Sequence, residues 1–213
     1  AQSAPLWSRN LGPSVPAGDF GTGFHDIAIE VGILSTPVID QNTGTLYAVS
    51  FTKETVGGVA TYIYRLHALD IATGAEKFGG PVALTASMSV PGKGTITFQP
   101  FKHLQRPALL LANGTVYVGF ASHGEQEIYH GWLLGYNASN LQQTFVFNAS
   151  PDSQAVGFWQ SGQGLAADSA GNLYAETGNG LFNVDTGGLS YGDSFIKLTP
   201  SGAVADYFTP SNQ

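Results

Sequence analysis

Residues 40–49 read Asp40-Gln-Asn-Thr-Gly-Thr-Leu-Tyr-Ala-Val49, and this pattern returns as Leu111-Ala-Asn-Gly-Thr-Val-Tyr-Val118 and as Asp168-Ser-Ala-Gly-Asn-Leu-Tyr-Ala175. In each copy, Asn or Asp and then Gly tolerate the positive φ of a hairpin turn. The Leu/Val-Tyr alternation that follows has the period of two residues that is typical of a half-buried strand. The sequence therefore repeats a turn followed by a strand, and such internal repeats indicate a repeat architecture.

One short apolar strand precedes each copy and two more follow it, which makes a unit of four strands. In the first unit, the fourth strand is expected at Glu76-Lys-Phe78. The spacing between copies exceeds the ~40–50 residues of a plain four-stranded blade, so insertions must lie between strands or between units. We predict an all-β fold, a β-propeller of four-stranded antiparallel blades, with complete blades at residues 34–84, 106–149 and 163–210.

A lone outer strand is expected at residues 5–11, with Trp7 in the place that Phe78 takes in the next unit. We therefore predict a single partial propeller domain over residues 1–213. A blade without its other strands has an open edge of unpaired N–H and C=O groups, which propellers remove by closing the ring. The chain is thus expected to be a fragment of a longer protein or, as the less favoured alternative, a protomer whose ring is completed by another chain.

Composition narrows the function classes. The chain has 28 Gly, 11 Pro and 11% charged residues, which favours many short strands over long helices. Its formal net charge of −7 argues against a nucleic-acid partner, because such binding depends on clustered cations. Cysteine is absent, so thiolate metal sites and a cysteine nucleophile are excluded. No apolar run reaches the ~18 residues of a membrane span, and we expect a protein secreted to the periplasm or the extracellular space.

The turn between the third and fourth strands of the first unit reads Ala68-Leu-Asp-Ile-Ala-Thr-Gly-Ala-Glu-Lys-Phe78. It resembles the Ala-x-Asp-x-x-x-Gly-x-x-x-Trp docking motif of pyrroloquinoline-quinone-type propellers, with Phe78 in place of the Trp. In quinoprotein dehydrogenases of this fold, the quinone and Ca²⁺ lie on the ring axis, often over a vicinal disulfide that cannot form here. We find no calcium-ligand set, so no cofactor is predicted for this chain. The resemblance is closer to the non-catalytic, quinoprotein-like repeat proteins.

Three polar, aromatic loops, at residues 20–30, 121–132 and 157–164, are candidates for a ligand site, because loops gathered at one end of a propeller line its central channel. Imidazole and carboxylate side chains in the second loop would suit a metal or a sugar, but the favoured interpretation is that His123 and His130 cap and pad a long hairpin loop. Trp159 and Gln160 in the third loop are suited to stacking on and hydrogen-bonding a polar ring, or to a close-packed strand entry. The candidate ligand-binding residues are His25, Asp26, Glu30, His123, Glu125, His130, Trp159, Gln160 and Asp193.

Three functions compete on this sequence. The leading one is a non-enzymatic module that binds a polar small molecule, a glycan or another protein through the loops between blades. The second is a portion of a quinoprotein-type oxidoreductase that uses pyrroloquinoline quinone with calcium, as the resemblance implies. The third is a purely structural scaffold. The sequence predicts no catalytic residue, and His67, which lies on an expected strand, is interpreted as a packed or edge residue.

Overall fold

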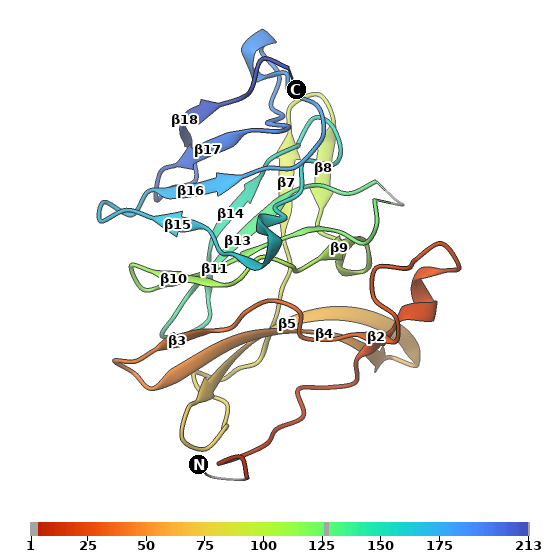
Figure 1. Ribbon diagram of the computed structural model, residues 1–213, viewed down its shortest axis with the longest axis vertical. Helices are drawn as coiled ribbons and strands as arrows, with labels where there is room; N and C mark the ends of the chain where they lie inside the picture. The colour runs from red at the N-terminus through yellow and green to blue at the C-terminus, as the bar shows by residue number, and fades with distance from the viewer. Residues whose placement is uncertain (1–3, 126–127, 213) are drawn as a thin grey trace.

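The computed structural model describes residues 4–125 and 128–212. Its main strands form three four-stranded antiparallel sheets that follow one another along the chain (Figure 1), which confirms the predicted propeller blades. Blade 1 consists of β3 (Val38–Asp40), β4 (Thr45–Val56), β5 (Val59–Asp70) and β6 (Val82–Ala83). Blade 2 consists of β10 (Leu110–Ala112), β11 (Thr115–Gly119), β13 (Trp132–Asn137) and β14 (Gln143–Asn148). Blade 3 consists of β15 (Ala166–Ala167), β16 (Leu173–Glu176), β17 (Phe195–Leu198) and β18 (Val204–Phe208).

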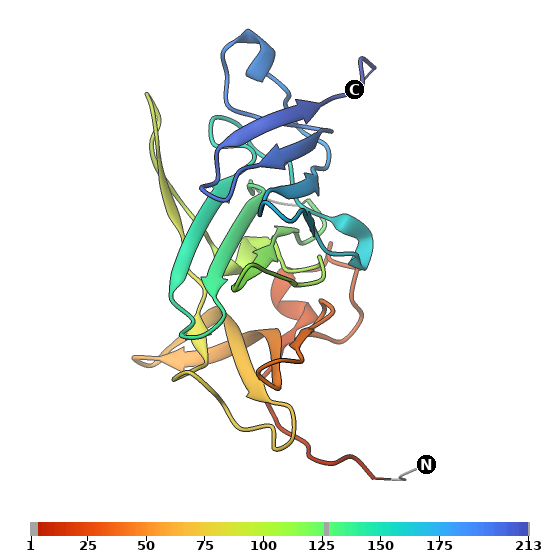
Figure 2. The same cartoon turned by 90° about the vertical axis from the view of Figure 1, so that its left-hand side faces the viewer.

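Short elements occupy the insertions that the repeat spacing requires. Three two-stranded sheets pair β1 (Val15–Pro16) with β2 (Glu30–Val31), β7 (Ser87–Val90) with β8 (Gly94–Thr97), and β9 (His103–Leu104) with β12 (Ala121–Ser122). Four 3₁₀ helices are η1 (Ala17–Phe20), η2 (Pro100–Lys102), η3 (Gln160–Gly162) and η4 (Val184–Thr186). The β7–β8 hairpin projects from one side of the molecule in Figure 2. Within the described ranges, no helix has the length and apolar character needed to cross a membrane.

The repeated tyrosine strand becomes the second strand of each blade. Tyr47 in β4 and Tyr117 in β11 are buried, whereas Tyr174 in β16 is half-buried. The hydroxyl of Tyr47 donates to the Ala138 carbonyl 2.6 Å away, which joins blade 1 to the turn of blade 2. Blades 1 and 2 share one apolar cluster and blades 2 and 3 share another, so the alternation seen in the repeat also fixes how the blades pack.

The first strands of the three blades lie side by side. The N–H of Leu109 donates to the Thr36 carbonyl over 3.0 Å, and the N–H of Ala108 donates to the Gln163 carbonyl, also over 3.0 Å. Ala108 and Gly164 form a parallel bridge as well. The residues that open these strands therefore gather at one place, as expected near a propeller axis.

Aromatic side chains dock onto turns of the following blade, as the docking motif implies. The Trp7 indole lies against Gly74, so close that a Cβ at this position would approach Trp7 to 2.6 Å, and its Nε1 donates to the Ile71 carbonyl at 2.9 Å. Phe145 of blade 2 contacts Gly202 of blade 3 in the same manner.

Two strand predictions need correction. Residues 5–11 form no strand, because they meet the turn of blade 1 through side chains and not a strand edge through backbone groups. In blade 1, Glu76 makes only an isolated bridge to Leu69, and the fourth strand resumes as β6. Phe78 has a φ of 57°, which breaks the extended chain between these two points.

Candidate functional site

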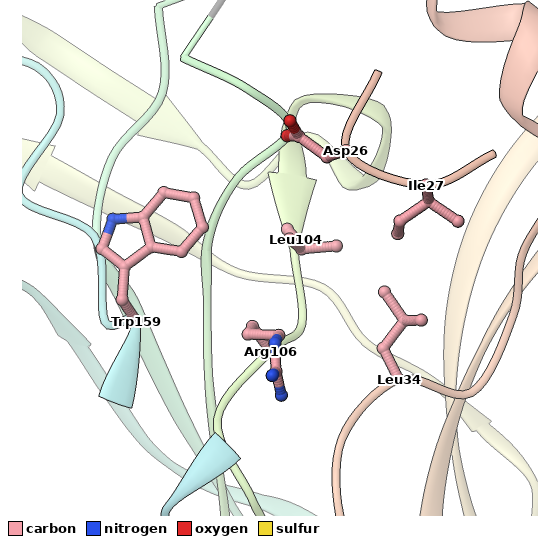
Figure 3. Close-up of a pocket in the computed structure, with 6 residues that line it drawn as sticks. All are labelled: Asp26, Ile27, Leu34, Leu104, Arg106 and Trp159. Carbon is pink, nitrogen blue, oxygen red and sulfur yellow. The ribbon is translucent and has the colours of Figure 1, made fainter. Parts of the chain in front are cut away.

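A pocket of about 500 Å³ lies where the inner strands begin. Two lining residues lie four positions before the first strand of a blade, namely Leu34 before β3 and Arg106 before β10. Trp159 comes from the segment that leads to β15. Figure 3 shows the indole on one side and the aliphatic residues on the other, with Asp26 and Arg106 at opposite ends. The pocket is lined by Asp26, Ile27, Leu34, Leu104, Arg106 and Trp159.

Trp159 is held in place by a glycine of blade 3. A Cβ on Gly178 would come within 2.7 Å of the Trp159 Cδ1, so only glycine permits the observed approach. The N–H of Gly178 donates to the Gly157 carbonyl at 2.8 Å, which ties the two segments together. In Figure 3 the indole nitrogen points away from Asp26 and Arg106, so the hydrocarbon part of the ring system faces the pocket.

The same indole also lines a smaller pocket of about 280 Å³, which lies toward blade 3. The Gln160 side chain is already engaged there, because its Oε1 accepts from the Glu176 N–H at 2.8 Å and its Nε2 donates to the Gly164 carbonyl at 3.2 Å. Gln160 therefore positions the strands β15 and β16, while polar groups of its neighbours remain for a ligand. The residues that line this pocket are Trp159, Gln160, Gln163, Glu176, Thr177 and Gly178.

Arg106 is half-buried, and it makes no hydrogen bond or ion pair with any described residue. The Arg106 guanidinium lies close to Gly162, where an added Cβ would be 3.0 Å from Nη1. Asp26 is exposed and is also unpaired within the described ranges. The pocket thus offers one cationic and one anionic group that the protein itself leaves unsatisfied.

None of the three candidate histidines lines this pocket, and His123 is buried. His123 has 6% of its surface exposed, and its ring lies 4.3 Å from Phe20 and 5.8 Å from Phe51, measured between ring centroids. Burial lowers the pKa of His123 to about 4, with the His103 backbone acting in the opposite direction. Neither ring nitrogen of His123 has a hydrogen-bond partner among the described residues. A neutral imidazole among phenyl rings pads the core.

His130 and Glu125 have separate partners, so the structure does not bring them together with His123 as one ligand set. The Nδ1 of His130 lies 2.9 Å from the Ser150 carbonyl oxygen, and burial lowers the pKa of His130. Glu125 accepts from the Tyr129 hydroxyl and from the Asn179 amide, both at 3.3 Å. The rest of this expected cluster, Gln126 and Glu127, lies outside the described residues.

Three other predicted site residues line neither pocket around Trp159. His25 is exposed, and Glu30 accepts from the Ser14 hydroxyl at 2.6 Å on the β1–β2 sheet. Asp193 is placed by its own N–H, which donates to the Gly178 carbonyl at 2.9 Å. Of the nine predicted residues, the structure therefore brings together Asp26, Trp159 and Gln160.

Sequence reasoning missed Arg106, Gln163 and Glu176 as pocket residues. Arg106 was interpreted only as the opening of a blade's first strand, Gln163 lay in the third candidate loop but was not chosen as a site residue, and Glu176 was given no role. One feature of the sequence could have pointed to Arg106 as a site residue. The chain has only eight Lys and Arg residues, and Arg106 precedes an otherwise apolar strand. A cation at that position is unnecessary for the strand itself.

A polar row on blade 1 has the order of groups found in serine hydrolases. Ser50 Oγ lies 2.9 Å from His67 Nε2, and His67 Nδ1 lies 2.8 Å from Glu76 Oε1. Ser50 is only 3% exposed, however, and it is covered by the Leu11 carbonyl, 3.4 Å from its Oγ. The adjoining cavity reaches His67 and Glu76 but not Ser50. The row therefore ties strands together, and His67 is a packed residue as expected.

The residues of the larger pocket do not fit pyrroloquinoline quinone with Ca²⁺. Calcium takes six to eight oxygen ligands. Within the described part of the chain, no three His, Asp or Glu side chains converge to hold a metal ion, and Asp26 is the carboxylate that lines this pocket.

Comparisons with known proteins add distant structural neighbours. No protein-family model and no curated protein matches the sequence. A quinohemoprotein alcohol dehydrogenase from Comamonas testosteroni aligns with a TM-score of 0.46 and 16% identity over 84% of this chain. Another, ADHIIG from Pseudomonas putida HK5, aligns with a TM-score of 0.41 and 13% identity over 86% of this chain. The chain spans 35% of the length of each, and these similarities are too distant to indicate an activity.

Proposed function

We propose that this chain is a binding module for a ligand with a polar ring, such as a sugar, and that Trp159 is the surface on which the ring stacks. The observation that carries the proposal is the position of this indole, which forms a wall shared by pockets of about 500 and 280 Å³. A single aromatic plate shared by two cavities suits a ligand of at least two joined rings.

The chemistry of the larger pocket supports this choice. Ligand pockets are commonly ~300–1,000 Å³ and combine apolar walls with a few polar groups that fix orientation. Here Ile27, Leu34 and Leu104 supply the apolar wall opposite Trp159, while Asp26 and Arg106 supply the polar groups. Sugars have an apolar ring face for the indole and hydroxyl groups for the polar side chains.

Isothermal titration of the protein with a panel of neutral and acidic oligosaccharides tests the proposal. We expect at least one to bind, and Trp159→Ala to weaken that binding by about 10-fold or more, the size of a stacking contact of ~1.5 kcal/mol. Trp7→Phe is the matched control, because Trp7 packs on Gly74 at the outer side of blade 1. Absence of binding across the panel, or equal binding by the Trp159→Ala variant, would overturn the proposal.

A sugar-binding module agrees with the secreted location expected from the sequence. The same experiment bears on the alternatives. Preferred binding of the quinone would favour the cofactor-dependent function, and absence of binding across the panel would favour a protein-binding or scaffold function. Pyrroloquinoline quinone with Ca²⁺ is included in the panel, and we expect it to bind less tightly than the preferred oligosaccharide.

A further inference from the structure

We infer that the ligand carries an acidic group and that Arg106 is its anchor, so that the site selects uronic acids over neutral sugars. This inference rests on the proposed function and names the ligand class of the same site. The observation behind the inference is that Arg106 lies in the pocket without an acidic partner among the described residues.

The first step concerns the cost of leaving Arg106 unpaired. Removing a charged group from water is unfavourable unless the protein supplies partners. Other arginines in this chain have partners, since Arg65 forms two bonds of 2.6 and 2.7 Å to Glu54, and Arg9 donates to the Gly74 carbonyl at 2.9 Å. Arg106 is half-buried without one in the described structure. A ligand anion would supply the missing partner.

The second step concerns the kind of anion. A guanidinium presents a planar fork of donors that matches a carboxylate in a bidentate geometry. The same end of the pocket borders Gly162, whose missing side chain leaves the guanidinium accessible, since a Cβ there would lie 3.0 Å from Nη1. A carboxylate attached to a ring can therefore reach Arg106 while the ring faces Trp159.

The third step concerns the orientation that Asp26 imposes. Figure 3 places the Asp26 carboxylate at the opposite end of the lining from Arg106. A carboxylate accepts hydrogen bonds and repels anions, so Asp26 favours sugar hydroxyl groups at its end. The chain as a whole also carries −7, which disfavours ligands with several negative charges. One carboxylate at one end of a hydroxylated ring satisfies both groups, as in a uronic acid.

The decisive experiment compares each acidic ligand with its own uncharged ester. Oligosaccharides that end in a single galacturonate, mannuronate or glucuronate residue on neutral sugars are titrated into the protein beside their methyl esters, which keep the ring and the linkage and lose the charge. We expect at least one acid to bind about 10-fold or more tightly than its ester, the factor expected of a charged hydrogen bond. Added salt is expected to reduce this ratio.

Two variants locate the effect. Arg106→Gln should bring the acid-to-ester ratio close to one, because it removes the charge that distinguishes an acid from its ester. Lys197→Gln removes the same amount of charge from β17, where the ammonium lies over the Tyr174 ring, and should keep the ratio.

The outcomes separate this inference from the proposed function. If esters bind as tightly as acids, or if Arg106→Gln keeps the acid preference, the inference is overturned while the sugar-binding proposal stands. If acids, esters and neutral sugars all fail to bind, the proposed function is overturned and the inference with it.

Discussion

The Cδ1 atom of Trp159 rests against the backbone of Gly178, with no room between them for a side chain on residue 178. One residue comes from the segment before blade 3 and the other from the loop after its second strand, β16. Contact between distant segments thus fixes the orientation of the residue on which the proposed ligand stacks.

Replacement of Gly178 by alanine should therefore displace the indole and weaken ligand binding. The added Cβ would come within 2.7 Å of Trp159, a distance at which the ring must move. We expect ligand affinity to fall by about 10-fold, comparable with loss of a positioned ring. Titration calorimetry of Gly178→Ala measures this. Gly18→Ala is the control, because a Cβ there meets nothing within 4 Å, and equal effects of both substitutions would contradict the account.

Replacement of Tyr47 by phenylalanine should lower the stability of the chain. The Tyr47 hydroxyl is buried and donates to the Ala138 carbonyl at 2.6 Å, so its removal leaves a buried acceptor without that donor. Such losses cost about 1–3 kcal/mol. Urea unfolding of Tyr47→Phe measures the change, and Tyr207→Phe on the exposed strand β18 serves as the control. A change below ~0.5 kcal/mol for Tyr47→Phe would show that the contact between blades 1 and 2 does not stabilise the fold.

Stability should fall as the pH drops from about 6.5 toward 4. Burial lowers the pKa of His103 to about 4 and the pKa of His123 to about 4, from 6.5. The unfolded chain then binds protons that the folded chain does not, so each histidine reduces the unfolding free energy by up to about 1.4 kcal/mol per pH unit in this window. The stability contributed by these groups is fully present above pH 6.5.

His123→Phe keeps the aromatic packing and removes one of the two groups, so it should flatten the dependence of unfolding free energy on pH. Urea unfolding at several pH values between 4.5 and 7 measures both slopes. Identical slopes for the unmodified protein and His123→Phe would mean that His123 is not held neutral.

The blade architecture was predictable because its signals are local. The turn at Asn113-Gly114 and the alternation around Tyr117 specify a hairpin within a few residues, and repetition of that pattern specifies the blades. Residues 5–11 were mispredicted as a strand because Trp7 occupies the place that Phe78 takes in the next unit. A strand also needs backbone hydrogen bonds to a neighbouring strand, which this segment does not make. The fourth strand of blade 1 is interrupted at Phe78 by a positive φ, which an aromatic residue in the sequence does not predict.

The pocket was less predictable because its walls come from segments that meet only after the blades pack. Asp26, Arg106 and Trp159 are far apart in the sequence, and no periodic pattern links them. The loop around His123 looked functional by composition, yet whether an imidazole faces solvent or phenyl rings depends on tertiary packing. Gln160 was chosen for its amide, which the fold uses to hold Glu176 and Gly164.

The most direct test of the central claim is a titration followed by the indole N–H resonances in NMR spectra. The chain has three Trp, so three such signals are expected, and Trp→Phe variants assign them. During titration with the preferred oligosaccharide, the account predicts that the Trp159 resonance shifts, while those of Trp7 and the fully buried Trp132 stay in place. A ligand that binds and shifts only Trp7, or none of the three, would contradict the proposal that Trp159 forms the binding surface.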